Sequence, residues 1–205
     1  MENVTLNGLR RRLGHVRVVG SLFYKLKETL ELIQLISRYS SDGAFSPGRD
    51  DEKEAIKLIE AGANPNVRPD ADSRMRPWTI GHQAIFCGSP ELLRIALSHG
   101  LGPNSSANKV VAGAASGSPI IAYEMTLAHF AAVGCHSDHS FLDILSEFGA
   151  NFNLRNSKGK TPLQAAIDTN GGVGGWVGNR NIAAVRYLET ITGIPNSSGQ
   201  PVVSP

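Results

Sequence analysis

The sequence has very few cysteines and no long apolar run. Its two cysteines, Cys87 and Cys135, lie far apart, which excludes a disulfide framework and the closely spaced cysteines of many zinc sites. We therefore expect free thiols in a reducing compartment. No apolar run approaches the ~18 residues of a membrane span, and no apolar signal segment follows the first basic residues. We expect a soluble, cytoplasmic protein, or one delivered into a host cell by a nonstandard route.

The sequence also has little net charge. A formal charge of +2 does not indicate nucleic-acid binding, which normally needs a dense basic face. The charge is uneven, however, because residues 1–27 hold a single acid, Glu2, and six cations: Arg10, Arg11, Arg12, Arg17, Lys25 and Lys27. We interpret residues 1–21 as a basic N-terminal arm that is solvated, with recruitment to nucleic acid or an acidic membrane as the alternative.

Phosphate-binding motifs are absent from the glycine-rich segment 169–181. Its sequence, TNGGVGGWVGNRN, contains neither G-x-G-x-x-G nor G-x-x-x-x-G-K-[ST], and a predicted helix rather than a strand precedes it. We therefore predict no nucleotide site there. Trp176 in this segment is predicted either to fold back onto the protein or to contact a partner.

Helical periodicity is present instead, beginning with residues 22–39. Apolar residues recur there at three- and four-residue steps, which predicts an amphipathic helix. A second helix is predicted over 50–61, because it opens with acids and Gly62 follows it as a C-terminal cap. A short polar turn comes next, and the same order of features then returns.

Two kinds of segment recur along the chain. Predicted helices end at a glycine followed by small residues and asparagine in EAGANPN at 60–66, SHGLGPN at 98–104 and EFGANFN at 147–153. Predicted helices also begin alike, in WTIGHQAIFCG at 78–88, MTLAHFAAVGC at 125–135 and KTPLQAAIDTN at 160–170. Recurrence at this scale indicates stacked repeats, in which neighbouring units bury apolar surface that no unit can bury alone.

These segments resemble the ankyrin repeat family, whose repeat is a turn followed by two helices with a T-P-L-H-x-A signature. Residues 159–166, GKTPLQAA, come closest to the signature and depart from it by Gln164 in place of histidine. Residues 126–132 and 79–84 keep the threonine, histidine and alanine. The resemblance covers about residues 50–190 and implies an all-α solenoid of stacked helix-turn-helix units with projecting hairpin loops.

The resemblance also implies how the chain is divided. The ankyrin-repeat domain spans residues 22–193 and is followed by a flexible tail at 194–205. Its four units are a cap at 22–66 and repeats at about 67–104, 105–153 and 154–193. The connection at 102–123 is longer than the family spacing, so we expect an enlarged hairpin there, with Ile120, Ile121 and Tyr123 in a short strand. A binding role and a tolerated insertion both remain open for this loop.

Partner contacts in the ankyrin family come from hairpin tips and from exposed positions at the end of each first helix. The matching positions hold aromatic, basic and methionine side chains, which are common at interfaces. The predicted partner-binding residues are Met75, Arg76, Trp78, Phe86, Tyr123, Met125, Lys158 and Lys160. Such a strip suits an acidic or amphipathic segment of another protein. For Trp78 and Phe86 the alternative is packing between repeats.

Candidate catalytic or metal-binding residues have simpler interpretations. His82 and His129 fall on the same repeat position, where the family uses histidine structurally. The cluster in CHSDHS at 135–140 holds several metal-ligating residue types, but we interpret it as a solvated turn rather than a zinc site. We therefore expect no catalysis, no cofactor, no metal and no small-molecule substrate.

The expected function is a monomeric, non-catalytic module that binds another protein through its concave face and enlarged hairpins. Two alternatives remain open from the sequence. The chain could be a regulatory or inhibitory subunit, or a microbial protein acting in a host cell. It could also be recruited to nucleic acid or an acidic membrane by the basic arm, and its affinity would then fall steeply with salt.

Overall fold

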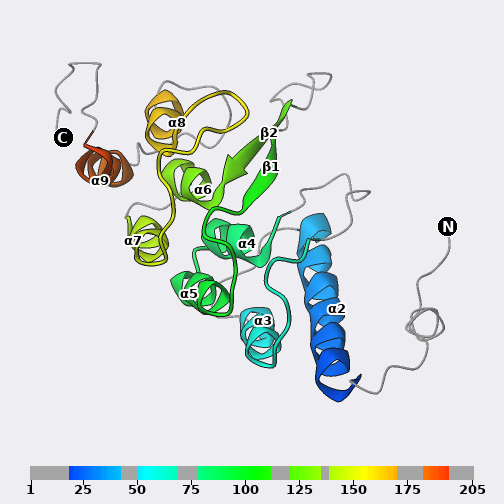
Figure 1. The fold of residues 1–205 in the computed structure, drawn as a ribbon. Helices are drawn as coiled ribbons and strands as arrows, with labels where there is room; N and C mark the ends of the chain where they lie inside the picture. Colours follow the sequence, from blue (N-terminus) through cyan, green and yellow to red (C-terminus); the bar gives the residue numbers. More distant parts are fainter. Residues whose placement is uncertain are drawn as a thin grey trace.

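The computed structural model describes residues 19–42, 50–68, 78–111, 121–134, 139–169 and 182–193. These ranges are mostly helical, as predicted, with one strand pair in addition (Figure 1). The helices and strands are α2 (Val19–Asp42), α3 (Asp50–Glu60), α4 (Ile80–Cys87), α5 (Pro90–Ser98), β1 (Ser106–Val111), β2 (Ile121–Thr126), α6 (Leu127–Val133), α7 (Ser140–Glu147), α8 (Pro162–Thr169) and α9 (Ile182–Thr192). No helix within these ranges is long and apolar enough to cross a membrane.

The helices after α2 lie in two rows, as Figure 1 shows. One row, here called the inner row, consists of α4, α6 and α8, which contact one another in chain order. The outer row consists of α3, α5 and α7, which do the same. Each inner helix also packs against the next helix along the chain, and α2 packs beside α3 at one end. The arrangement is therefore a series of helix pairs stacked side by side.

A β-hairpin projects from the array between α5 and α6 (Figure 1). Strands β1 and β2 pair antiparallel, with Ser106 opposite Thr126 and Val111 opposite Ile121. This confirms the hairpin expected from the long connection at 102–123, and it places Ile121 and Tyr123 in a strand. Ile120 lies outside the described residues. The hairpin ends where α6 begins, since the last residue of β2, Thr126, is also the N-cap of α6.

One continuous apolar core runs between the rows. Leucines on the outer row, such as Leu93 on α5 and Leu145 on α7, are fully buried against the inner helices. Burial of each such side chain stabilises the fold by roughly 1.5–3 kcal/mol. Alanines of the inner row, including Ala84 and Ala132, are also buried and allow neighbouring helices to approach closely. Cys87 on α4 is buried, and its Sγ accepts a hydrogen bond from Nε2 of Gln83 at 3.7 Å.

The recurrent glycines end helices as the sequence predicts. Gly62, Gly100 and Gly149 all have positive φ, between 76° and 103°, a backbone conformation that side chains with a Cβ disfavour. The backbone amides of Ala63, Leu101 and Ala150, which follow these glycines, then donate back to the last turn of the preceding helix at 2.9 Å. The chain therefore reverses direction in the same way after α3, α5 and α7.

Asparagines that follow these glycines connect one unit to the next. The Oδ1 atom of Asn66 accepts from the Gly102 amide at 3.0 Å, and its Nδ2 donates to the Gly100 carbonyl at 2.8 Å. One unit further on, Oδ1 of Asn104 accepts from the Asn151 amide at 2.7 Å. We call these bonds the asparagine ladder. They satisfy backbone groups that the turns would otherwise leave unpaired.

Replacing Asn66 with alanine is expected to lower the free energy of unfolding by about 0.5–1.5 kcal/mol for each hydrogen bond lost, because two backbone groups of the next unit lose their partner and bind water instead. Urea unfolding followed by circular dichroism would measure the change. Asn153 is the matched control, since it ends the third glycine segment and its side chain makes no hydrogen bond within the described residues. Equal stability of both variants would mean that the ladder adds nothing.

Candidate functional site

Two buried histidines lie at equivalent positions in the first turns of α4 and α6, each beside the threonine that precedes its helix. His82 Nδ1 lies 2.8 Å from the Thr79 hydroxyl at the start of α4, and His129 Nδ1 lies 2.7 Å from the Thr126 hydroxyl at the start of α6. In α6 the cap is reciprocal, because the His129 amide donates to Thr126 Oγ1 while the Thr126 amide donates to His129 Nδ1. The structural role expected for these histidines is confirmed.

The second nitrogen of each imidazole faces the next unit. His129 Nε2 lies 2.9 Å from the Lys160 carbonyl oxygen, just before α8. Because Nδ1 accepts from the Thr126 amide, Nε2 carries the proton and donates to this carbonyl. His82 is placed likewise toward the backbone of Met125, although in a geometry outside the normal limits for a hydrogen bond. His129 therefore caps its own helix and binds the backbone that precedes the next one, whereas the hydrogen-bond contact of His82 is with Thr79 alone among the described residues.

Burial keeps both imidazoles neutral. It lowers the pKa of His82 to about 3, with the positive charge of Arg68 acting in the same direction and interaction with the Met125 backbone opposing it. Burial likewise lowers the pKa of His129, and the hydrogen bond to Lys160 partly offsets that effect. Both side chains are therefore uncharged near pH 7, which suits their roles as fixed hydrogen-bonding groups.

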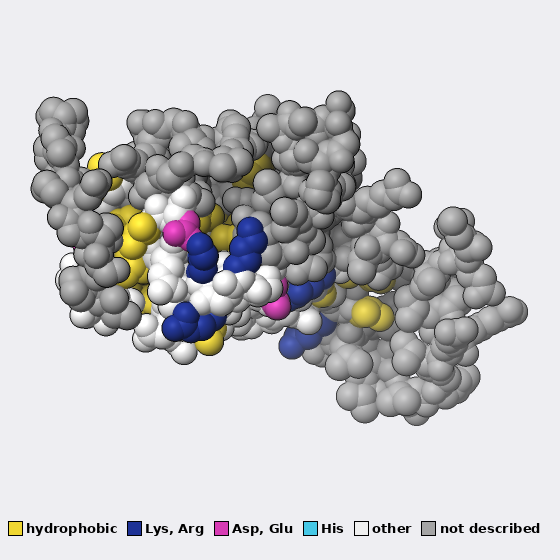
Figure 2. Space-filling view, turned by 90° about the horizontal axis from the view of Figure 1, so that it is seen from above, with side chains coloured by type: hydrophobic (Ala, Val, Ile, Leu, Met, Phe, Trp, Pro, Cys, Tyr) yellow, Lys and Arg dark blue, Asp and Glu magenta, His cyan; other side chains and the backbone are white. Residues whose placement is uncertain are grey.

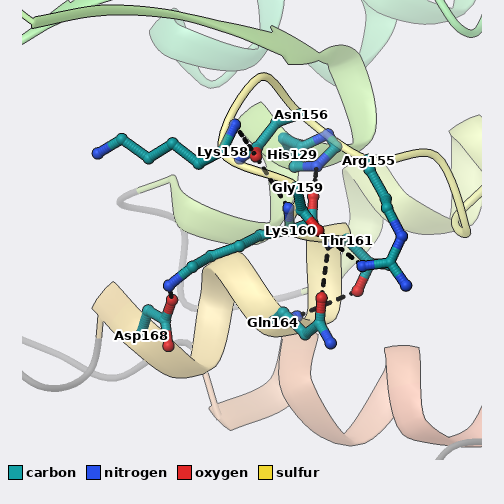
Figure 3. Close-up of polar contacts among 9 residues, drawn as sticks. All are labelled: His129, Arg155, Asn156, Lys158, Gly159, Lys160, Thr161, Gln164 and Asp168. Atoms are coloured by element: carbon teal, nitrogen blue, oxygen red, sulfur yellow. Dashed lines mark hydrogen bonds and ion pairs between the residues drawn. The ribbon is translucent and has the colours of Figure 1, made fainter.

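The turn between α7 and α8 is fixed by its own hydrogen bonds (Figure 3). The side-chain oxygen of Asn156, which is nine-tenths buried, accepts from the amides of Lys158 at 2.9 Å and Lys160 at 3.1 Å. The Gly159 amide donates to the Asn156 carbonyl at 2.8 Å, and the Arg155 guanidinium donates to the Gly159 carbonyl at 2.6 Å. Residues 155–160, here called the 155–160 tip, therefore form one hydrogen-bonded unit.

The 155–160 tip is also attached to the β-hairpin of the preceding unit. The Ser157 amide donates to the Glu124 carbonyl at 3.3 Å, and the Glu124 amide donates to the Ser157 hydroxyl at 3.0 Å. His129 also donates a hydrogen bond to the Lys160 carbonyl, so the tip is attached to the rest of the fold at both Ser157 and Lys160. Such anchoring reduces the conformational freedom that a surface turn normally has.

Positive side chains gather at this tip. Figure 2 shows Lys and Arg side chains clustered on the face seen from above, with few acids between them. Arg155 and Lys158 are exposed, whereas Lys160 is partly exposed and forms an ion pair with Asp168 on α8 (Figure 3). The exposed positive charge of the tip therefore comes mainly from Arg155 and Lys158.

Comparison with known proteins assigns no family. No family model matches the chain, and no curated protein matches it either.

Two predicted contact residues are not accessible. The side chain of Trp78 is 4% exposed and that of Met125 is 2% exposed, so neither can bind a partner directly. Trp78 makes edge contacts with Phe86 of its own unit and Phe130 of the next, at 5.1 Å between ring centroids in both cases. Trp78 therefore packs between units, which was the alternative interpretation of this residue. Phe86 follows the same interpretation, because it is partly buried against the same core.

The remaining predicted residues divide into two groups. Lys158 and Lys160 lie together at the 155–160 tip, as their positions predicted. Met75 and Arg76 lie outside the described residues, and Tyr123 is placed in β2 without a described side chain. Sequence reasoning missed Arg155 and Asn156. The signal for Asn156 was present, because asparagine close before a glycine is typical of tight turns.

The candidate metal cluster lies mostly outside the described residues, which leave out 135–138. His139 is described, and its Nε2 lies 3.4 Å from Asp143 on α7 while its ring stacks on Tyr187 of α9 at 5.1 Å. Among the described residues no group of three or more ligating side chains could hold a metal ion. Residues 1–18, Trp176 and the tail at 194–205 also lie outside the described ranges.

Proposed function

We propose that this chain is an ankyrin-type repeat protein that binds another protein, without catalysis, through the side that carries its hairpin and turns. The observation that supports the repeat interpretation best is the equivalence of successive units. A threonine hydroxyl contacts a histidine Nδ1 at the start of both α4 and α6, and the asparagine ladder joins matching positions of three successive turns. The resemblance of the sequence to ankyrin repeats points to the same architecture.

The hairpin side is proposed as the binding side because its backbone is fixed by hydrogen bonds, while Glu124 on β2 and Arg155 and Lys158 at the 155–160 tip have exposed side chains. Both the 155–160 tip and the base of the β-hairpin are fixed by bonds between units. Binding residues are often placed on loops that a rigid scaffold positions. The inner and outer helices direct most of their apolar side chains into the shared core, so the projecting segments offer the more distinctive surface.

Site-specific photo-crosslinking would test the proposal. A benzophenone amino acid would replace Lys158 at the tip or, as the matched control, Lys57 on α3, since both lysines are exposed. In an extract of the native source, we expect a discrete crosslinked protein from position 158 and none from position 57. Crosslinks from position 57 alone, or the same proteins from both positions, would contradict binding through the hairpin side.

A further inference from the structure

We propose that helix α2 binds a second copy of this chain, so that two molecules pair through antiparallel α2 helices. Helix α2 lies at one end of the array and packs on one side against α3 (Figure 1). Within the described residues no further unit precedes it there. The contact goes beyond the proposed function, which concerns the hairpin and the turns, and a dimer would replace the monomer expected from the sequence.

Helix α2 carries apolar side chains on two faces. One face is buried in the core, and its members are Leu32, Leu35 and Ile36. The other face, here called the α2 stripe, consists of Leu26, Leu30 and Ile33. Because successive residues of a helix are about 100° apart, the two faces point about a third of a turn away from each other. All three side chains of the stripe are partly exposed, and among the described residues none of them belongs to the core or packs against its buried side chains.

The spacing of the α2 stripe is self-complementary. Leu26 lies four residues before Leu30, and Ile33 lies three residues after it, so all three share one face of the helix. In an antiparallel pair with its two-fold axis near Leu30, this leucine faces its own counterpart, and Leu26 faces Ile33 of the second copy. A two-fold interface needs the same patch on both partners. One face of α2 therefore provides both halves of the contact.

The charges beside the α2 stripe match the antiparallel arrangement. Lys27 and Glu31 have side chains that are 60% and 44% exposed, and they form an ion pair of 3.6 Å within one copy. Both border the stripe on the same side, so the antiparallel pair brings Lys27 beside Glu31 of the second copy. Exposed Lys25 borders the stripe on its other side, and a parallel pair would bring it beside Lys27 of the second copy. Like charges disfavour that alternative, so the charges select the antiparallel orientation.

The size of the α2 stripe sets the expected strength of the dimer. From Leu26 to Ile33 the stripe is only ~10 Å long, at 1.5 Å per helical residue. Stable complexes bury roughly 800 Å² on each partner, and a contact of two helical turns on each copy is smaller than that. We therefore expect a weak dimer, with a dissociation constant of ~10–100 µM.

Sedimentation equilibrium of the full chain tests the apolar part of the contact. Ile33→Asp is expected to weaken the dimer by at least ~tenfold, because it places a carboxylate in the centre of an apolar interface. The matched control is Ile191→Asp on α9, which makes the same change at a side chain that is 39% exposed at the other end of the array. It should change the dissociation constant less than about twofold. Circular dichroism would confirm that both variants keep the fold.

Exchanged charges test the orientation without changing the apolar side chains. Lys27→Glu and Glu31→Lys should each weaken the dimer by about three- to tenfold, because each variant places like charges together on both sides of the two-fold axis. An equimolar mixture of the two variants should associate about as strongly as the wild type, since opposite charges face each other again in the mixed pair. Both side chains are exposed, so neither change disturbs the core.

Several results would overturn the inference. A chain that stays monomeric up to ~0.5 mM, well above the expected dissociation constant, would exclude the dimer. Equal weakening by Ile33→Asp and Ile191→Asp would place the association on another surface, and a mixture that fails to recover would exclude the antiparallel pair. A monomer in which Ile33→Asp speeds tryptic cleavage at Arg10, Arg11 or Arg12 would make residues 1–18 the occupant. None of these outcomes bears on the binding tested at position 158.

Discussion

Replacing Trp78 with alanine is expected to lower the free energy of unfolding by about 3–5 kcal/mol, one of the largest effects in this protein. The indole is 4% exposed and fills the space between Phe86 of α4 and Phe130 of α6. Its removal would leave a cavity between α4 and α6, and aromatic edge contacts would be lost as well. Equilibrium unfolding in urea, followed by far-ultraviolet circular dichroism, would measure the loss.

The control is Trp78→Phe, which keeps an aromatic ring in the same space and should cost clearly less than the alanine variant. Partner binding by the alanine variant would fall only as far as the folded fraction falls. If Trp78→Ala abolished binding while leaving the unfolding transition unchanged, the residue would be a contact after all. The measurement therefore distinguishes packing between units from direct recognition, the two interpretations that the sequence allowed.

The helix boundaries could be predicted from sequence because their causes are local. Gly62, Gly100 and Gly149 end helices through a backbone conformation that depends on the residue itself. At α6, Thr126 and His129 form a cap within a single turn, and at α4 the same spacing brings Thr79 and His82 into contact, so the spacing locates the start of both helices. The predicted helix at 22–39 is extended at both ends in α2, an error typical of helix boundaries.

The exposure of aromatic residues could not be predicted in the same way. Trp78 is buried because Phe130 lies over it, and Phe130 comes from the next unit, after the β-hairpin. Whether an aromatic side chain such as Trp78 is buried or exposed is therefore decided by a helix that is distant in the sequence. At the 155–160 tip, Lys158 and Lys160 were predicted because they occupy the hairpin positions of the family repeat. Arg155 was missed because its role depends on its bond to the Gly159 carbonyl, which only the folded turn creates.

Acidification below about pH 6.5 is expected to destabilise the protein through its buried histidines. His82 has its pKa lowered from 6.5 to about 3 in the folded state, so between these values the unfolded chain binds a proton that the folded protein does not. The stability that neutral His82 provides is complete above pH 6.5 and is lost as the pH falls toward 3. Between pH 7 and 5 the loss from His82 alone is about 2 kcal/mol, and His129 adds to it in the same direction.

Glutamine variants would test this assignment, because the chain itself uses glutamine at the equivalent position of α8. There the Gln164 amide donates to Thr161 Oγ1 at 3.3 Å and the Thr161 amide donates to Gln164 Oε1 at 3.1 Å, which reproduces the cap without a titrating group. We expect His82→Gln to remove about 2 kcal/mol of the change in unfolding free energy between pH 7 and 5, whatever its effect at pH 7. An unaltered pH dependence in His82→Gln would mean that the buried imidazole titrates alike in the folded and unfolded states, and that acid acts on this fold through its carboxylates instead.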